Sequence, residues 1–207
     1  MREIMTGSTD GSGPTTTMKT TEEIEMRKIV AGLFVSLDGV IEAPEQWHFP
    51  YFNDEMGAAV AAQMAAADTM LLGRRTYQEF AAYWPHQGSD VPGADQMNNT
   101  PKLVVSTTLD RVEWQNSTLI KGNVVEELTR LKQQPGKNIG ITGSATLVRS
   151  LLRDKLLDEL QLLVHPIVVG RGKRLFEDMG EQVALKLVAA QTFSTGVLAL
   201  TYEPAGA

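Results

Sequence analysis

The sequence of 207 residues contains no cysteine and only three histidines, His48, His86 and His165. Without cysteine there is no disulfide, no thiolate nucleophile and no cysteine-ligated zinc, and the scattered histidines lack metal-ligand spacing, so we expect no metal site. A net charge of −6 argues against a nucleic-acid-binding protein, which is normally basic. That charge still permits a local positive pocket for a small anionic ligand.

Long apolar runs are also missing, since the longest ones are far too short to span a bilayer. No charged and then apolar leader opens the chain, so we expect a cytoplasmic protein without a membrane partner. Neither G-x-G-x-x-G nor G-x-x-x-x-G-K-[ST] occurs, which excludes the Rossmann fingerprint and the P-loop.

Residues 1–25 differ in composition from the rest of the chain. TGSTDGSGPTTT, residues 6–17, consists of small polar residues around one proline and has nothing to bury. We predict a disordered tail over 1–25, either an added segment or an extended natural start, and one domain over 26–207.

Strand and helix patterns alternate along this domain. Predicted strands cover 28–37, 69–73, 102–107, 117–121 and 138–142, and predicted helices cover 54–67, 77–83, 124–134 and 144–154. A T-x-x-E capping box at Thr76 and Glu79 sets the start of the second helix, and Asn123 is expected to cap the third. Three further strands are predicted over 159–170, 184–194 and 197–204. This order predicts an α/β fold whose sheet is mostly parallel, with antiparallel strands at its end.

Three predicted strand ends carry small, polar or cationic residues. They are Gly73-Arg74-Arg75-Thr76, Ser106-Thr107-Thr108 and Thr142-Gly143-Ser144-Ala145-Thr146. Ligands of α/β sheets bind beyond the carboxyl ends of the strands, where helix N-termini attract phosphates. Singly, each stretch also fits a plain loop or helix cap, and the two arginines fit a solvated turn. Together they predict a nucleotide site.

Five blocks in order resemble the dihydrofolate reductase-like proteins, above all the reductase half of the bifunctional riboflavin-biosynthesis deaminase–reductase and its stand-alone relatives. The blocks are VSLDGVIE (35–42), LLGRRTYQEF (71–80), KLVVST (102–107), GITGSATLVRSLL (140–152) and DELQLLVHPIVVGRGKRLF (158–176). The resemblance covers roughly residues 27–202. It implies a homodimer with a three-layer fold, a mixed and mostly parallel sheet with helices on both faces, and NADPH lying across the sheet.

The resemblance also implies roles for the strand ends. The adenosine side of NADPH and its 2′-phosphate would contact Gly73, Arg74, Thr76, Ser106 and Thr107, with Thr108 beside them. The pyrophosphate would lie on Gly143, Ser144, Ala145 and Thr146. Arg74 and Arg75 would then select NADPH over NADH by pairing with the additional phosphate.

The substrate end is expected within residues 36–52, SLDGVIEAPEQWHFPYF. Asp38-Gly39 fits a hairpin turn equally well, but the resemblance implies that Asp38 faces the substrate near the nicotinamide, with Val35 and Ile41 flanking that ring. Trp47 is a candidate ligand contact, whereas Phe49 and Phe52 are expected to plug the core.

Two histidines and a tryptophan complete the candidates. His48 is either a proton donor or a surface residue, and His165 is expected to be a structural residue. Trp84 is either part of the pocket wall or simple packing.

These residues predict an NADPH-dependent oxidoreductase that transfers hydride to a small heterocyclic substrate (pterin-, flavin- or aminopyrimidine-like) or a conjugated one. The proton would come from Asp38, His48 or water. Asp54 and Glu55 look like helix-start acids, so folate reduction is not expected. A second possibility is an NADP(H)-binding module without turnover, and a third is a scaffold without cofactor.

Overall fold

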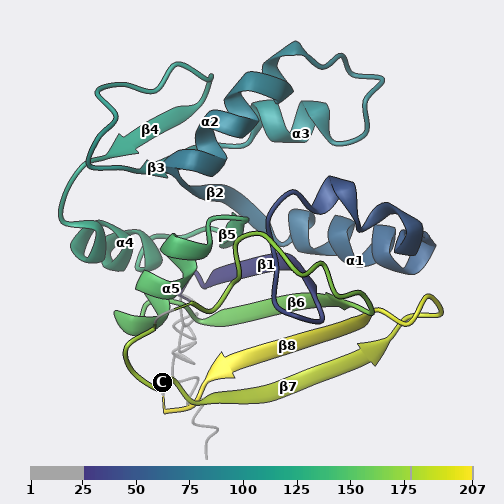
Figure 1. The fold of residues 1–207 in the computed structure, drawn as a ribbon. Helices are drawn as coiled ribbons and strands as arrows, with labels where there is room; N and C mark the ends of the chain where they lie inside the picture. Colours follow the sequence, from purple (N-terminus) through teal and green to yellow (C-terminus); the bar gives the residue numbers. More distant parts are fainter. Residues whose placement is uncertain (1–25, 178, 207) are drawn as a thin grey trace, which may run out of the picture.

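The computed structural model describes residues 26–177 and 179–206 (Figure 1). The tail predicted over 1–25 lies outside the described residues. The strands are β1 (Ile29–Ser36), β2 (Ala67–Gly73), β3 (Lys102–Val105), β4 (Ser117–Ile120), β5 (Asn138–Thr142), β6 (Glu159–His165), β7 (Leu185–Thr192) and β8 (Leu198–Pro204). The α-helices are α1 (Asp54–Ala65), α2 (Arg74–Tyr83), α3 (Ala94–Asn99), α4 (Val124–Lys132) and α5 (Ala145–Arg153), and short 3-10 turns are η1 (Pro44–Gln46), η2 (Phe49–Tyr51) and η3 (Trp84–His86).

All eight strands belong to one sheet in the order β4-β3-β2-β5-β1-β6-β8-β7. The neighbours from β4 to β6 run parallel, and only β8 and β7 are antiparallel to their partners. The central strand β1 places Ala31 between Ile141 of β5 and Leu160 of β6. The predicted α/β class with a mixed, mostly parallel sheet is therefore confirmed.

Helices cover both faces of the sheet, because alternate residues of each strand enter different cores (Figure 1). On one face, the odd-numbered residues of β1 pack with Leu128 of α4 and Val148 of α5. On the other face, Phe34 of β1 packs against Met56 of α1. On the same second face, Leu72 of β2 and Val104 of β3 pack against α2 and α3. These three layers confirm the dihydrofolate reductase-like architecture.

The start of α2 and the end of β6 differ from the prediction, and the cap of α4 differs in its geometry. Helix α2 begins at Arg74, so the capping box at Thr76 was wrong: Gly73 is the N-cap residue, and Thr76 is buried inside the first turn. Asn123 does occupy the N-cap of α4, but with φ 48° and without a side-chain bond. The strand predicted to reach residue 170 ends at His165, because Pro166 has no N–H to continue the ladder.

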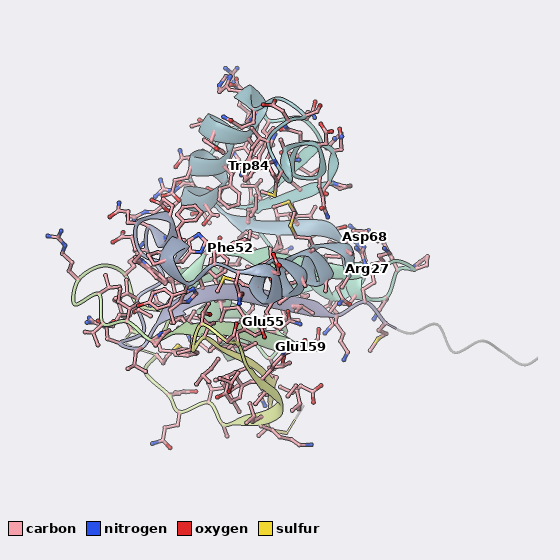
Figure 2. All side chains as sticks on the ribbon, turned by 90° about the vertical axis from the view of Figure 1, so that its right-hand side faces the viewer. Arg27, Phe52, Glu55, Asp68, Trp84 and Glu159 are labelled. Carbon is pink, nitrogen blue, oxygen red and sulfur yellow. The ribbon has the colours of Figure 1, made fainter. Side chains whose placement is uncertain are left out.

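A buried arginine links neighbouring strands at their amino-terminal ends. Arg27 forms an ion pair with Asp68 (Figure 2), and its guanidinium also donates to Thr69 Oγ1 at 2.8 Å and to the carbonyl of Lys137 at 2.7 Å. These contacts join the amino-terminal ends of β1, β2 and β5, so the carboxyl ends of these strands meet at the other edge. Among the described residues, no helix has the length and apolar character needed to cross a membrane.

Candidate functional site

Ser144 joins two strand ends at the carboxyl edge of the sheet. Its Oγ accepts a hydrogen bond from the Gly73 N–H at 2.9 Å and donates one to Thr76 Oγ1 at 2.9 Å. Strand β2 lies beside β5, which places the turn after β2 directly against the turn after β5. We call Gly73, Thr76 and Ser144 the strand-end cluster. The structure thus brings together three of the residues that the sequence predicted for one site.

Two helices begin at this cluster without a side-chain cap. Gly73, the N-cap residue of α2, has no side chain, and the Ser144 hydroxyl forms no capping bond to α5. The first-turn N–H groups of a helix need outside acceptors, and the helix end carries a partial positive charge. Two such ends beside each other suit a ligand with adjacent phosphate groups.

The backbone around Ser144 is held in an unusual conformation. Gly143 has φ 66° and Ser144 has φ 58°, both in the left-handed region, and the second is rare for a residue with a side chain. A Cβ added at Gly143 would lie 3.2 Å from Thr76 Cγ2, so this position also lacks room. Non-glycine residues in this region cluster at functional sites, where surrounding contacts hold them.

Arg74 and Arg75 open helix α2 and are both exposed. Neither forms an ion pair with another residue within the described part of the chain. Two permanently charged, forked donors therefore lie next to the positive end of a helix. Both a solvated turn and a phosphate contact require exposed arginine side chains. The uncapped helices favour the phosphate contact.

The third predicted strand end follows β3, the other neighbour of β2. Val105 is in register with Gly73, so Ser106 follows the carboxyl end of β3 beside the end of β2. The buried Ser106 hydroxyl accepts from the N–H groups of Thr108, at 3.1 Å, and Leu109, at 3.0 Å. Ser106 therefore closes a turn, while Thr107 and Thr108 are exposed at the edge.

Asp38 is held by hydrogen bonds from its own turn and from the segment that follows β6. Its carboxylate accepts from Ser36 Oγ at 2.6 Å and from the N–H groups of Val169, at 3.0 Å, and Gly170, at 2.9 Å. The Ser36 hydroxyl, followed by the Val169 amide, holds the pKa of Asp38 well below its ordinary value. These contacts, with the Arg174 guanidinium 3.6 Å from the carboxylate, tie Asp38 to the segment after β6, and a carboxylate that stays ionised is unsuited to donate a proton.

The apolar candidates for the substrate end differ in how far they are buried. Val35 is buried in the core on the α4 and α5 face, and Ile41 packs against the same core. Trp47 is buried too, with its indole N–H donated to the Glu42 carbonyl at 3.0 Å. Phe49 and Phe52 are 63% and 50% exposed, so the prediction that they plug the core was wrong.

His48 and His165 form a buried aromatic cluster with Phe34 and Trp47. The ring of His48 stacks on Phe34 at 4.6 Å between centroids, and Trp47 meets His165 edge-on at 5.1 Å. His48 Nδ1 and His165 Nε2 are buried without a hydrogen-bond partner among the described residues. Burial is the main cause that lowers the pKa of both rings. The surface alternative for His48 was therefore wrong, whereas the structural assignment of His165 agrees with its full burial.

A pocket of about 350 Å³ lies between α1 on one side and α2, η3 and α3 on the other. Its floor is formed by strands β1, β2, β5 and β6, and we call it the interhelical pocket. Thr142, the last residue of β5, lines the pocket and directly precedes Gly143, so the pocket adjoins the strand-end cluster. Trp84 lies in its wall above the sheet (Figure 2), where it also packs against Phe80.

The wall formed by α3 was not predicted, and a buried lysine supports it. Lys102 Nζ donates to the carbonyls of Met97 at 2.9 Å, Asn98 at 3.0 Å and Thr100 at 2.7 Å. The ammonium also lies 4.1 Å from the centre of the Trp114 ring. Burial lowers the pKa of Lys102 to about 8, so the ammonium is still the main form at neutral pH.

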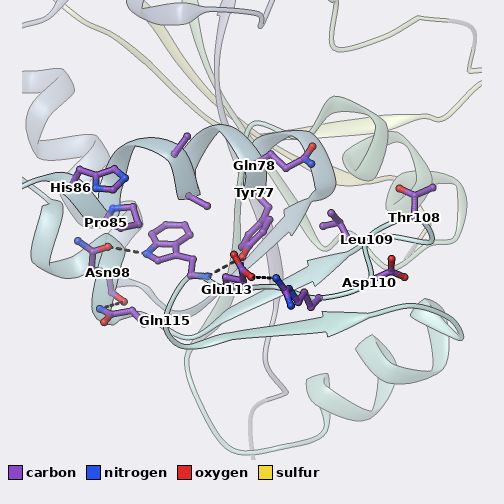
Figure 3. Close-up of a pocket in the computed structure, with 14 residues that line it drawn as sticks. Tyr77, Gln78, Pro85, His86, Asn98, Thr108, Leu109, Asp110, Glu113 and Gln115 are labelled. Atoms are coloured by element: carbon purple, nitrogen blue, oxygen red, sulfur yellow. Dashed lines mark hydrogen bonds and ion pairs between the residues drawn. The ribbon is translucent and has the colours of Figure 1, made fainter.

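A larger and more open hollow of about 850 Å³ lies on the outer side of α2 (Figure 3). There the Tyr77 hydroxyl accepts from the N–H groups of Glu113, at 2.8 Å, and Trp114, at 3.0 Å, and Trp114 Nε1 donates to Asn98 Oδ1 at 2.8 Å. These bonds hold the β3–β4 loop against α2 and α3. Thr108 is the only residue of the predicted cofactor set that lines this hollow.

Sequence reasoning missed Gln63 and Gln161, whose amides meet across the floor of the interhelical pocket. The available signal was Gly32, an isolated glycine within a strand, which often marks the close approach of another group. The short helix α3 gave no such signal.

Known proteins resemble this chain over most of its length. The profile described as the RibD C-terminal domain matches residues 27–199. The uncharacterized protein YyaP of Bacillus subtilis (strain 168) is 32% identical over 189 residues, which cover 88% of this chain and 98% of YyaP. YwjB of the same organism is 29% identical over 174 residues, covering 83% of this chain and 95% of YwjB.

Solved structures show the same fold at lower identity. A Shewanella sp. PV-4 protein named for riboflavin biosynthesis has 21% identity and a TM-score of 0.71, over 86% of this chain and 99% of that one. Dihydrofolate reductase from Enterococcus faecalis, solved with NADP(H), has 17% identity and a TM-score of 0.56, over 86% and 96%. A Thermotoga maritima enzyme named as a deaminase and 5-amino-6-(5-phosphoribosylamino)uracil reductase has 13% identity and a TM-score of 0.62, over 87% of this chain and 57% of that one. With the family profile spanning nearly the whole described domain, the chain belongs to the RibD C-terminal domain family.

Proposed function

We propose that this protein is an NADPH-dependent reductase of a small heterocyclic or conjugated substrate. The observation that carries the proposal is the bridge from Ser144 to Gly73 and Thr76, which joins two uncapped helix N-termini at one edge of the sheet. Family membership and the NADP(H) complex of the Enterococcus faecalis relative support the same conclusion.

The residues present fit a phosphorylated dinucleotide. The first turns of α2 and α5 would hold the pyrophosphate, while Arg74 and Arg75, with Thr107 and Thr108, would hold the adenosine 2′-phosphate. When bound, NADPH supplies a hydride to an electron-poor carbon of the substrate.

The substrate would occupy the interhelical pocket, whose wall continues from the strand-end cluster through Thr142. Apolar walls there exclude water, and fixed partners on both sides hold the reactants in place. Asp38 is hydrogen-bonded to the segment after β6 and His48 is stacked on Phe34, so the proton for the reduced product would come from solvent water.

The affinity of the purified chain for NADPH and for NADH tests this proposal. Arg74→Ala and Arg75→Ala are expected to lose about 1.5–3 kcal/mol of NADPH binding, more than about tenfold, with little change for NADH. Arg153→Ala, at the far end of α5, is the matched control and should bind both cofactors like the wild type. If neither variant changes the preference for NADPH, the assignment of the two arginines fails.

A second candidate is an NADP(H)-binding module without turnover, which would act as a sensor or use the cofactor structurally. It is favoured by the lack of any ionisable side chain among the described residues that line the interhelical pocket. A tight NADPH complex that is never oxidised by pterins, flavins, aminopyrimidines or quinones would support it over the reductase.

We also propose that two copies pair as a homodimer through the β7 edge of the sheet. Every residue of β7 after Leu185 is exposed, including Leu187 and Val188. Light scattering after gel filtration should give twice the chain mass, and Val188→Lys should reduce it to that of one chain.

A further inference from the structure

The interhelical pocket is mostly apolar, and the few polar groups in its lining carry no charge. Among the described residues that line it there is no Asp, Glu, Lys, Arg or His. Its polar members are side-chain amides and hydroxyls: Gln63, Gln96, Asn138, Gln161, Thr100 and Thr142. The rest of the lining is aliphatic, aromatic or glycine. A ligand inside therefore meets apolar surface and neutral hydrogen-bonding groups.

Two of these amides are fixed in direction by a chain of hydrogen bonds. Gln161 Nε2 donates to Glu159 Oε1 at 2.5 Å, which turns Gln161 Oε1 towards α1, where it accepts from Gln63 Nε2. Gln63 Oε1 then accepts no hydrogen bond from another residue of the described ranges and is not enclosed by protein. The pocket thus offers one oriented carbonyl acceptor and the remaining amide N–H groups, which match the edge of a lactam or amide.

The amide pair is built into the fold at Gly32. A Cβ at this position would lie 1.8 Å from Gln63 Nε2 and 2.3 Å from its Oε1. Only glycine therefore lets the Gln63 side chain lie flat on β1 and reach Gln161 on the next strand.

No cation is available to balance an anionic ligand among the described residues of this pocket. Lys102, which supports α3, already donates three hydrogen bonds to the carbonyls of Met97, Asn98 and Thr100. The exposed cations Arg74 and Arg75 begin α2 at the carboxyl edge of the sheet and do not line the pocket. Burying an unpaired phosphate or carboxylate in such a pocket costs several kcal/mol, so charged ligands are disfavoured.

We infer that the interhelical pocket takes an uncharged, non-phosphorylated molecule whose lactam or amide edge pairs with Gln63. Resting on the proposed function, this assigns the substrate of the reductase to that class. The class differs from the phosphoribosyl compound in the name of the Thermotoga maritima relative. Negative charge is bound at the strand-end cluster, and the pocket selects for neutrality.

Matched neutral and anionic probes test the inference on the full chain without cofactor. Uracil is compared with orotate, and benzamide with benzoate, by saturation-transfer NMR and titration. Each neutral probe is expected to bind at least about tenfold more tightly than its carboxylate partner. Gln63→Met, which keeps the length of the side chain, should weaken the neutral probes at least about fivefold, whereas Gln133→Met at the exposed C-cap of α4 should leave them unchanged.

Equal or tighter binding of the carboxylates would overturn the inference, and so would neutral binding that is insensitive to Gln63→Met. Should that variant fail to fold, the amide spectrum of the wild-type chain decides: uracil has to shift resonances of α1 and β6, and shifts elsewhere alone contradict the assignment. The proposed function is tested separately by NADPH binding. If the chain binds uracil selectively but does not bind NADPH, only the proposed reductase function is contradicted. If it binds NADPH but binds orotate as tightly as uracil, only the inference of a neutral pocket is contradicted.

Discussion

The hydroxyl of Ser144 donates to Oγ1 of Thr76 over 2.9 Å, although the two residues are 68 positions apart in the chain. Because the same Ser144 Oγ accepts from the Gly73 amide, the start of α5 is locked against the start of α2. The relationship fixes how two helix N-termini lie beside each other, and it makes Ser144 the residue on which the proposed cofactor site depends.

Replacing Ser144 should therefore affect stability and cofactor binding together. Ser144→Ala leaves the Gly73 N–H without its acceptor, and we expect it to cost about 1–2 kcal/mol of unfolding free energy and about tenfold in NADPH affinity. Ser144→Gly loses the same bonds but adopts φ 58° without strain, so it should be more stable than the alanine variant and bind NADPH equally poorly. Calorimetry and NADPH titration measure both effects, and an alanine variant with wild-type affinity would contradict the role of this bridge.

Asp38→Asn should reduce stability without removing a catalytic acid. Asparagine cannot accept all the hydrogen bonds that Ser36, Val169 and Gly170 donate to the carboxylate, so the midpoint of thermal unfolding at neutral pH should fall. Once a substrate is known, the pH dependence of kcat should keep the shape of the wild-type profile. Loss of one limb of that profile in Asp38→Asn would show that the carboxyl does transfer a proton.

The two buried histidines should make the fold sensitive to acid. Burial lowers the pKa of His48 and His165 below the ordinary value of 6.5, so below this pH the unfolded chain binds more protons than the folded one. Their contribution to stability is therefore complete above about pH 6.5 and is lost as the pH falls through the lower folded values. Urea unfolding at several pH values between 7.5 and 5 measures this dependence.

The double variant His48→Gln/His165→Gln should show a flatter dependence of unfolding free energy on pH in the same range. The exposed His86 provides the control, since His86→Gln should retain the slope of the wild type. A double variant as acid-sensitive as the wild type would mean that other groups cause the loss.

Lys102→Met should loosen one wall of the interhelical pocket. The three carbonyls that Lys102 satisfies lie at the carboxyl end of α3, and leaving them without a donor should cost about 1–3 kcal/mol of unfolding free energy. Hydrogen exchange should be faster for the amides of α3 than for those of α5. Lys28→Met, at an exposed site before β1, should change neither, and unchanged α3 protection in Lys102→Met would contradict the supporting role.

Local patterns in the sequence were sufficient for most of the fold. The β-branched run at the start of the domain, the alanine-rich stretch of α1 and the Pro135-Gly136 stop after α4 each predict an element that the structure contains. Helix α3 was missed because it is short and is preceded by Gly93, and the strand through His165 was predicted too long because apolar residues continue beyond Pro166. Helix α3 therefore depends on contacts that the sequence pattern does not reveal, whereas the proline that ends β6 is visible in the sequence.

Some residues of the candidate site were likewise predictable from the sequence, and others were not. Residues at strand ends, such as Gly73 and Ser144, were predictable because parallel strands bring their carboxyl ends to one edge. Side chains in the loop after β1 were not, since the sequence could not tell that Trp47 would be buried while Phe49 became exposed. The Gln63–Gln161 pair joins residues 98 positions apart, and only the packing of α1 on the sheet reveals it.

The crystal structure of the chain with NADPH is the most direct test of how this edge of the sheet is used. We predict that the pyrophosphate accepts hydrogen bonds from first-turn amides of α5, including Thr146, and that Arg74 or Arg75 contacts the 2′-phosphate while the nicotinamide lies beside Thr142. Density for the dinucleotide on the outer side of α2, or crystals that take up no NADPH at saturating concentration, would contradict the proposal.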